Sequence, residues 1–248
     1  MGDFGAGVMA KALMSNESIT VLRVQGNKIT DVGASELAGM MKSNTTLKVC
    51  DLGDNEISNT GLGALAEAFK INTTLRDCFL GVNKISDDGA SALADAFKSN
   101  ASLEYFSLSV NNVSNLGAFA IADAFKINAT LERFRINGNN ITNAGARALA
   151  DSIKRNATLL VLDLGGNKIA DDGGKALVDA LKMNSTLMTL DVNDNPMSDA
   201  TKAEIGALVK RNKERPAEAA AGVTAERKRR AAAAGGGGDG GSSSSGFG

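Results

Sequence analysis

The sequence predicts an α/β fold, a right-handed solenoid in which parallel strands line the concave face and helices cover the convex face. Three observations support this prediction. An asparagine recurs every 28 residues, the residues after it alternate like a short strand, and the second half of each period has helical spacing. The recurring asparagines are Asn16, Asn44, Asn72, Asn100, Asn128, Asn156, Asn184 and Asn212.

The first half of each period is predicted to be a strand. In the period that begins at Asn156, the apolar Leu162 and Leu164 alternate with Val161 and Asp163. An alternation of period two places one row of side chains in a core and the other row on a surface. We therefore expect a short strand with one buried face in every period.

The second half of each period is predicted to be a helix. Within residues 89–98, Ala90, Leu93, Ala94 and Phe97 follow the spacing of one helical face. Parallel strands lie about 4.8 Å apart, whereas helix axes need about 8–10 Å. The helices must therefore occupy the longer, outer arc of a horseshoe. With 9 Phe, 1 Tyr and no Trp, we expect Leu, Ile, Val, Ala and Met to build the core.

The periodicity divides the chain into three parts. Residues 1–15 match the helical half of a partial repeat, residues 16–212 form seven repeats, and residues 213–248 are expected to be a disordered tail rich in Ala, Gly and Ser with a basic cluster at 227–230. The first strand, around 21–24, has no strand before it. An open strand edge invites pairing. We therefore expect that the chain is a truncated product, is part of a longer solenoid, or packs against another subunit at this edge.

The run Leu-x-x-Leu-x-Leu-x-x-Asn, seen at 159–167, resembles the leucine-rich repeat, and the 28-residue period resembles its ribonuclease-inhibitor-like subtype. The repeats of NOD-like receptors and of Ran GTPase-activating protein are similar. The resemblance covers residues 5 to about 212. It implies a protein that binds a partner on its concave face and that carries no cofactor.

Composition excludes several functions. There is no histidine, which removes imidazole bases and histidine-ligated metals, and we predict no catalytic residues, no metal site and no cofactor. A net charge of −1 does not indicate the basic surface that is typical of nucleic-acid-binding proteins. No apolar run has the length of a membrane helix. Two cysteines and the lack of a secretory leader favour a cytoplasmic protein, with the cytoskeleton or cilium as a specific setting. Nuclear import through Arg227–Arg230 is a less favoured alternative.

The candidate partner-binding residues lie at outward positions of the predicted strands. Aromatic and arginine side chains are typical of interface hot spots. The alternative is that the two aromatic residues simply pair across strands. The predicted site consists of Phe79, Tyr105, Arg133 and Arg135, with Asp51 and Asp163 assisting.

Asparagine and cysteine columns receive structural interpretations. The column that contains Asn44 is predicted to supply left-handed turns between helix and strand. A second column, Asn27 to Asn195, is predicted to be a stack of amides at the turns that end the strands, where backbone groups face inward and the amides can satisfy their neighbours. Cys50 and Cys78 occupy equivalent inward positions and are predicted to be free thiols.

The predicted function is a non-enzymatic scaffold for protein–protein interaction, part of a signalling, ciliary or cytoskeletal assembly. One alternative is a GTPase-activating regulator that resembles Ran GTPase-activating protein, although that family carries an acidic tail and this tail is basic and then Gly/Ser-rich. Another is a sensor fragment of the NOD-like-receptor type. The sequence identifies neither the partner nor the pathway.

Overall fold

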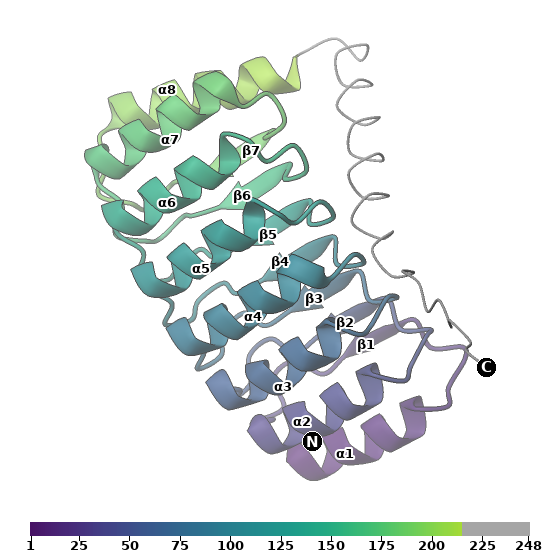
Figure 1. Cartoon of the computed structure of the whole chain (residues 1–248). Coiled ribbons are helices and arrows are strands. Elements are labelled where there is room, and N and C mark those ends of the chain that lie inside the picture. Colours follow the sequence, from purple (N-terminus) through teal and green to yellow (C-terminus); the bar gives the residue numbers. More distant parts are fainter. Residues whose placement is uncertain (215–248) are drawn as a thin grey trace, which may run out of the picture.

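The computed structural model describes residues 1–214 as a curved row of helices beside a sheet (Figure 1). The helices are α1 (Gly2–Leu13), α2 (Asp31–Met41), α3 (Asn59–Phe69), α4 (Asp87–Ser99), α5 (Asn115–Phe125), α6 (Asn143–Ile153), α7 (Asp171–Met183) and α8 (Asp199–Lys213). The strands are β1 (Val21–Arg23), β2 (Val49–Asp51), β3 (Asp77–Phe79), β4 (Tyr105–Ser107), β5 (Arg133–Arg135), β6 (Val161–Asp163) and β7 (Thr189–Asp191).

The seven strands form one parallel sheet in sequence order. Each residue pairs with the residue 28 positions later, as in Leu22 with Cys50 and Cys78 with Phe106. The predicted α/β solenoid, with strands on one face and helices on the other, is confirmed. Helix α1 begins at Gly2, whose N–H donates to Asn27 O at 2.9 Å.

The described residues end just after the last repeat. Helix α8 continues through Lys213, one residue past the predicted boundary. The rest of the predicted tail, with the basic cluster at 227–230, lies outside the described residues.

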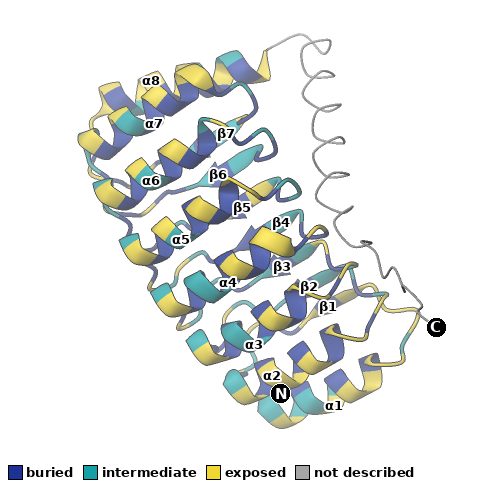
Figure 2. Ribbon diagram, in the orientation of Figure 1, coloured by how far each residue is buried: buried dark blue, intermediate teal, exposed yellow. Residues whose placement is uncertain are grey.

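The core lies between the sheet and the helices, and the middle residue of every strand is buried in it. Figure 2 shows that each helix has a buried and an exposed side. In the centre of the core, Phe106 on β4 packs edge-on against Phe69 of α3 and Phe97 of α4, with ring centroids 5.8 and 5.3 Å apart. Phe134 on β5 continues this row. The core is built mainly from Leu, Ile, Val, Ala and Met, as expected, and five buried phenylalanines add to it, because stacked units provide several equivalent places for a large ring.

The asparagines at the turns between helix and strand adopt extended rather than left-handed backbone. Asn100 has φ −69° and ψ 130°, and Asn184 has φ −87° and ψ 135°. The side chain explains the choice of residue instead. Asn100 Oδ1 accepts hydrogen bonds from the N–H groups of Ser102 and Leu103, at 3.0 and 2.8 Å. The left-handed prediction is wrong, since the amide side chain shapes this turn.

The second asparagine column bonds to the backbone groups that the turns leave facing inward, as the sequence predicts. Asn55 Nδ2 donates to the carbonyl oxygens of Val24 and Leu52, at 3.1 and 3.0 Å. Its Oδ1 accepts from the N–H of Ile29 at 2.9 Å. A buried backbone group without a partner is costly, so each asparagine satisfies groups of its own repeat and of the preceding one.

A third column was not predicted from the sequence. The first residue of a helix, an aspartate or asparagine, holds the start of the next helix. Asp31 Oδ1 accepts from the N–H groups of Ser58 and Gly61, at 2.7 and 2.9 Å, and Asp31 Oδ2 accepts from Ser58 Oγ. Acceptors at a helix N-terminus satisfy its unpaired N–H groups. The signal in the sequence is the Asp or Asn at 3, 31, 59, 87, 115, 143 and 171.

Candidate functional site

Two aromatic side chains meet on the outward face of the sheet. Phe79 ends β3 and Tyr105 begins β4, and the alternation of the strands points both away from the core. Their ring centroids lie 4.8 Å apart with an interplanar angle of 70°. Both side chains remain partly exposed. The structure therefore brings together the two aromatic residues of the predicted site.

Two arginines from β5 lie against the same tyrosine ring. The guanidinium carbons of Arg133 and Arg135 are 4.8 and 5.5 Å from the centroid of Tyr105. Contacts of this kind are attractive because the ring face carries negative charge. We call Phe79, Tyr105, Arg133 and Arg135 the aromatic–arginine cluster. Its members come from three consecutive strands.

The ion pairs of the cluster are long. Arg133 reaches Asp77 and Arg135 reaches Asp163, each at a nitrogen-to-oxygen distance of 3.9 Å. The arginine side chains keep 48% and 52% of their surface exposed. Exposed pairs at such distances contribute little to stability, so both guanidinium groups stay available to another carboxylate.

Asp163 also has a structural role. Its Oδ1 accepts a hydrogen bond from Gly165 N–H at 3.1 Å, and Asp51 receives the same bond from Gly53 at 3.0 Å. Burial raises the pKa of Asp163, and the charge of Asp191 adds to this, while the Gly165 N–H and Arg135 oppose it. Asp51 and Asp163 thus shape the loops after their strands, and Asp163 in addition faces the cluster. Asp51 pairs in register with Phe79.

Asp77 belongs to the site but was missed by the sequence reasoning. Burial raises its pKa, with Glu104 adding to the effect and Arg133 opposing it. Tyr105 lies between Asp77 and Arg133 in the register of the sheet. The sequence could have indicated this contact, because Asp77 and Arg133 carry opposite charges at the same position of strands that lie two apart.

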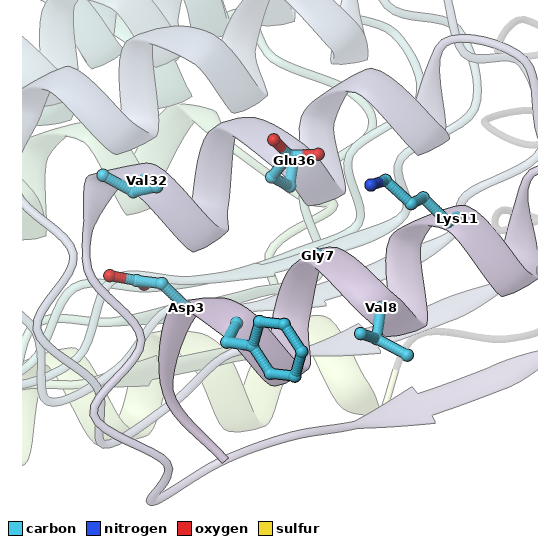
Figure 3. A pocket seen from close by; sticks show the side chains of 7 residues that line it. Asp3, Gly7, Val8, Lys11, Val32 and Glu36 are labelled. Carbon is cyan, nitrogen blue, oxygen red and sulfur yellow. The ribbon is translucent and has the colours of Figure 1, made fainter.

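A second surface lies at the N-terminal end of the solenoid. Figure 3 shows side chains that line a pocket between α1 and α2. The volume of this pocket is about 260 Å³. Asp3, which lines it, is already bonded to Thr30 and Gly33 of the next unit. The apolar lining is the more exposed part, since Phe4, Val8 and Val32 have 86%, 52% and 64% of their surface accessible.

The described residues contain no cluster suited to a metal ion. Across residues 1–214, no three Cys, Asp or Glu side chains gather as ligands. None of the helices in the same range combines the length and the apolarity needed to cross a bilayer. Cys50 and Cys78 are both buried and free, which confirms the prediction of unpaired thiols.

Comparison with known families decides the identity of the repeats. A model of the leucine-rich repeat matches the chain seven times, at residues 15–38, 43–66, 72–94, 99–122, 128–150, 155–178 and 184–200. The chain belongs to the leucine-rich repeat family. Together with the single parallel sheet, these matches confirm the predicted repeat. The ribonuclease-inhibitor-like subtype stays a prediction.

Two solved structures that resemble this chain belong to proteins of very different sequence. The tropomodulin C-terminal domain of Caenorhabditis elegans has a TM-score of 0.54 and 15% identity, covering 63% of this chain and 93% of the domain. The leiomodin-1 actin-binding site 2 has a TM-score of 0.41 and 16% identity, covering 91% of this chain and 96% of that one. No curated protein matches the sequence. At such identity the likeness to the tropomodulin domain shows a shared fold.

Proposed function

We propose that this leucine-rich repeat protein is a non-enzymatic scaffold that binds a protein partner through the aromatic–arginine cluster on its concave face. The observation that carries the proposal is the position of two arginines over a partly exposed tyrosine that also contacts a phenylalanine. Interface hot spots are rich in such side chains. Asp51 and Asp163 support the cluster by fixing the loops at its edges.

The competing explanation is that the aromatic pair only stabilises the sheet. Cross-strand aromatic pairs contribute about 0.2–1 kcal/mol, so removing one would lower stability slightly in either case. Binding separates the two explanations, since only a partner site loses affinity when the cluster is removed.

The test compares three forms of the protein in affinity capture from native lysate, with the captured proteins identified by mass spectrometry. Phe119 lies on the exposed side of α5, in the helix layer, and serves as the control. We expect a partner that is retained by the wild type and by Phe119→Ala, and lost by the double variant Phe79→Ala/Tyr105→Ala. Circular dichroism confirms that both variants are folded. Equal retention by all three forms removes the cluster from consideration as the binding site.

The cytoskeletal setting is a finer part of the proposal and has its own measurement. Co-sedimentation with purified actin filaments and with microtubules tests whether either polymer carries the protein into the pellet. We expect the same double variant to lose any such binding. If neither polymer binds, the signalling setting replaces the cytoskeletal one.

The N-terminal edge is proposed as a second contact surface, supported by the exposure of Phe4 and Val8. Isolated exposed apolar residues are ordinary, but these two line one pocket together with Val32. Cross-linking followed by light scattering, on wild type and on Phe4→Ser/Val8→Ser, checks this surface. A monodisperse monomer that captures nothing through this edge contradicts the proposal.

A further inference from the structure

One loop position after each strand has left-handed backbone in all seven repeats. The residues and their φ angles are Gly26 (69°), Asp54 (50°), Val82 (55°), Val110 (53°), Gly138 (66°), Gly166 (60°) and Asp194 (55°). Glycine adopts this conformation freely and aspartate tolerates it. A β-branched residue does so rarely and with strain. Val82 and Val110 are therefore the two residues that the fold itself does not favour.

The strain at these valines is not offset by burial. Val82 keeps 48% and Val110 keeps 51% of its surface exposed. The Val110 side chain leans over the next loop, where a Cβ on Gly138 would lie 3.1 Å from Val110 Cγ2. Backbone strain that persists without a structural gain concentrates at functional sites.

The two valines lie in neighbouring loops that directly continue the strands of the cluster. Val82 N–H donates to Ser109 O, and Val110 N–H donates to Asn137 O, each at 2.8 Å. Val82 follows Phe79 by three residues on the same strand and loop. Phe79 itself replaces the aspartate that holds this loop in other repeats, as Asp51 and Asp163 do. In this repeat, apolar residues thus stand both where Asp51 and Asp163 hold the loop in other repeats and where other repeats carry Gly or Asp in the left-handed conformation.

The charge beside this apolar area indicates what it would receive. Arg133 and Arg135 both lie against the ring of Tyr105. Among residues 1–214, each arginine has one ion pair, with Asp77 and with Asp163 respectively, and in both the nitrogen-to-oxygen distance is 3.9 Å. A carboxylate placed between two guanidinium groups forms short, charge-assisted hydrogen bonds. The surface therefore combines the apolar loop residues Val82 and Val110 with two guanidinium groups that have no short ion pair to a carboxylate.

We propose that Val82 and Val110 extend the partner site from the strands onto the loop rim, and that the occupant is an extended peptide segment of the partner. Its acidic side chain contacts Arg133 and Arg135, and its aliphatic side chains cover Phe79, Val82 and Val110. This inference rests on the proposed function of the aromatic–arginine cluster, and it adds the rim and the chemistry of the bound segment.

The experiment selects ligands from a random peptide display library on the wild-type protein. We expect the selected peptides to share an acidic residue next to aliphatic residues. One such peptide, labelled with fluorescein, is then titrated with each variant and followed by anisotropy. We expect Val82→Gly/Val110→Gly to lower the affinity at least about tenfold, because two apolar contacts are lost, with an unchanged or higher melting temperature, because glycine relieves the strain.

Matched variants distinguish the outcomes. Asp54→Gly changes the same left-handed column outside the cluster and should leave affinity unchanged. The inference is overturned if Val82→Gly/Val110→Gly binds like wild type while Phe79→Ala/Tyr105→Ala does not, a result that leaves the proposed function standing. It is also overturned if the glycine variant loses stability along with affinity. Selected peptides without acidic residues contradict the predicted chemistry, and binding that survives both double variants overturns the proposed function as well.

Discussion

The side-chain amide of Asn100 donates a hydrogen bond to the backbone carbonyl of Phe69, 31 residues earlier, at 2.7 Å. The same bond joins Asn128 to Phe97 at 2.8 Å and Asn72 to Met41 at 2.7 Å. Each carbonyl is the last or nearly the last in its helix, where no helical N–H remains to donate to it. One asparagine thus closes the helix of the preceding repeat while its Oδ1 shapes its own turn.

Replacing Asn100 with alanine should destabilise the protein by about 2–4 kcal/mol, because buried backbone groups then lose their partners. Urea unfolding followed by circular dichroism measures the change. Asn112→Ala is the matched control, since Asn112 is exposed and accepts a bond only at the surface. Equal unfolding midpoints for the two variants would contradict the structural role of Asn100.

Replacement of phenylalanine by alanine should lower the free energy of unfolding strongly at Phe106 and only slightly at Phe119. Phe106 is fully buried between two rings, so Phe106→Ala should cost about 3–5 kcal/mol through lost burial and a cavity. Phe119 is 39% exposed on a helix, so Phe119→Ala should cost less than about 1 kcal/mol. Thermal unfolding of both variants checks the order, and a larger loss at Phe119 would require a different core.

Asp171 predicts a specific loss of stability in acid. Hydrogen bonds from Thr201 and from the N–H and hydroxyl of Ser198 hold the pKa of this carboxyl at about 2, below its ordinary value of 3.8. The stabilisation is full above the unfolded pKa and disappears as the pH falls from about 4 through about 2. Asp171→Asn retains the accepting oxygen, as Asn143 does for Gly173, and should flatten this part of the curve. Unfolding midpoints between pH 2 and pH 7 test the prediction, and an unchanged slope in the variant refutes it.

The two core thiols should be inert in the native protein. Burial raises the pKa of Cys50 to about 12 and raises that of Cys78 as well, and thiol reagents attack the thiolate. We expect an aromatic disulfide reagent at pH 8 to react slowly with the folded protein and with both thiols in urea. Rapid reaction of the native protein would show that the strands open locally.

The sequence predicted the parts of the fold that repeat. The 28-residue period, the alternation around Leu162 and the helical stripe of Ala90, Leu93, Ala94 and Phe97 each reflect a local periodicity that survives in any copy of the unit. The phenylalanine row at Phe106 was not predictable in this way. It depends on which helix side chains face which strand, and this is set by packing between units.

The candidate site was predictable only in part for a similar reason. Outward strand positions follow from alternation, so Phe79 and Tyr105 were placed on one face. The reach of Arg133 across Tyr105 toward Asp77 depends on side-chain conformation. The left-handed backbone at Val82 contradicts the preference of valine, and a method that weighs residue preferences would not assign it. The predicted roles of Asp51, Asp163 and the cluster in binding stay predictions.

Every contact between elements in residues 1–214 joins neighbours along the solenoid, such as α4 with α5 or β5 with β6. Stability in such an array is a sum of terms for single units and for adjacent interfaces. Whole periods can therefore be added or removed by recombination without redesigning a common centre. The length of the sheet is therefore a quantity that can change through duplication, while its outward side chains change one by one.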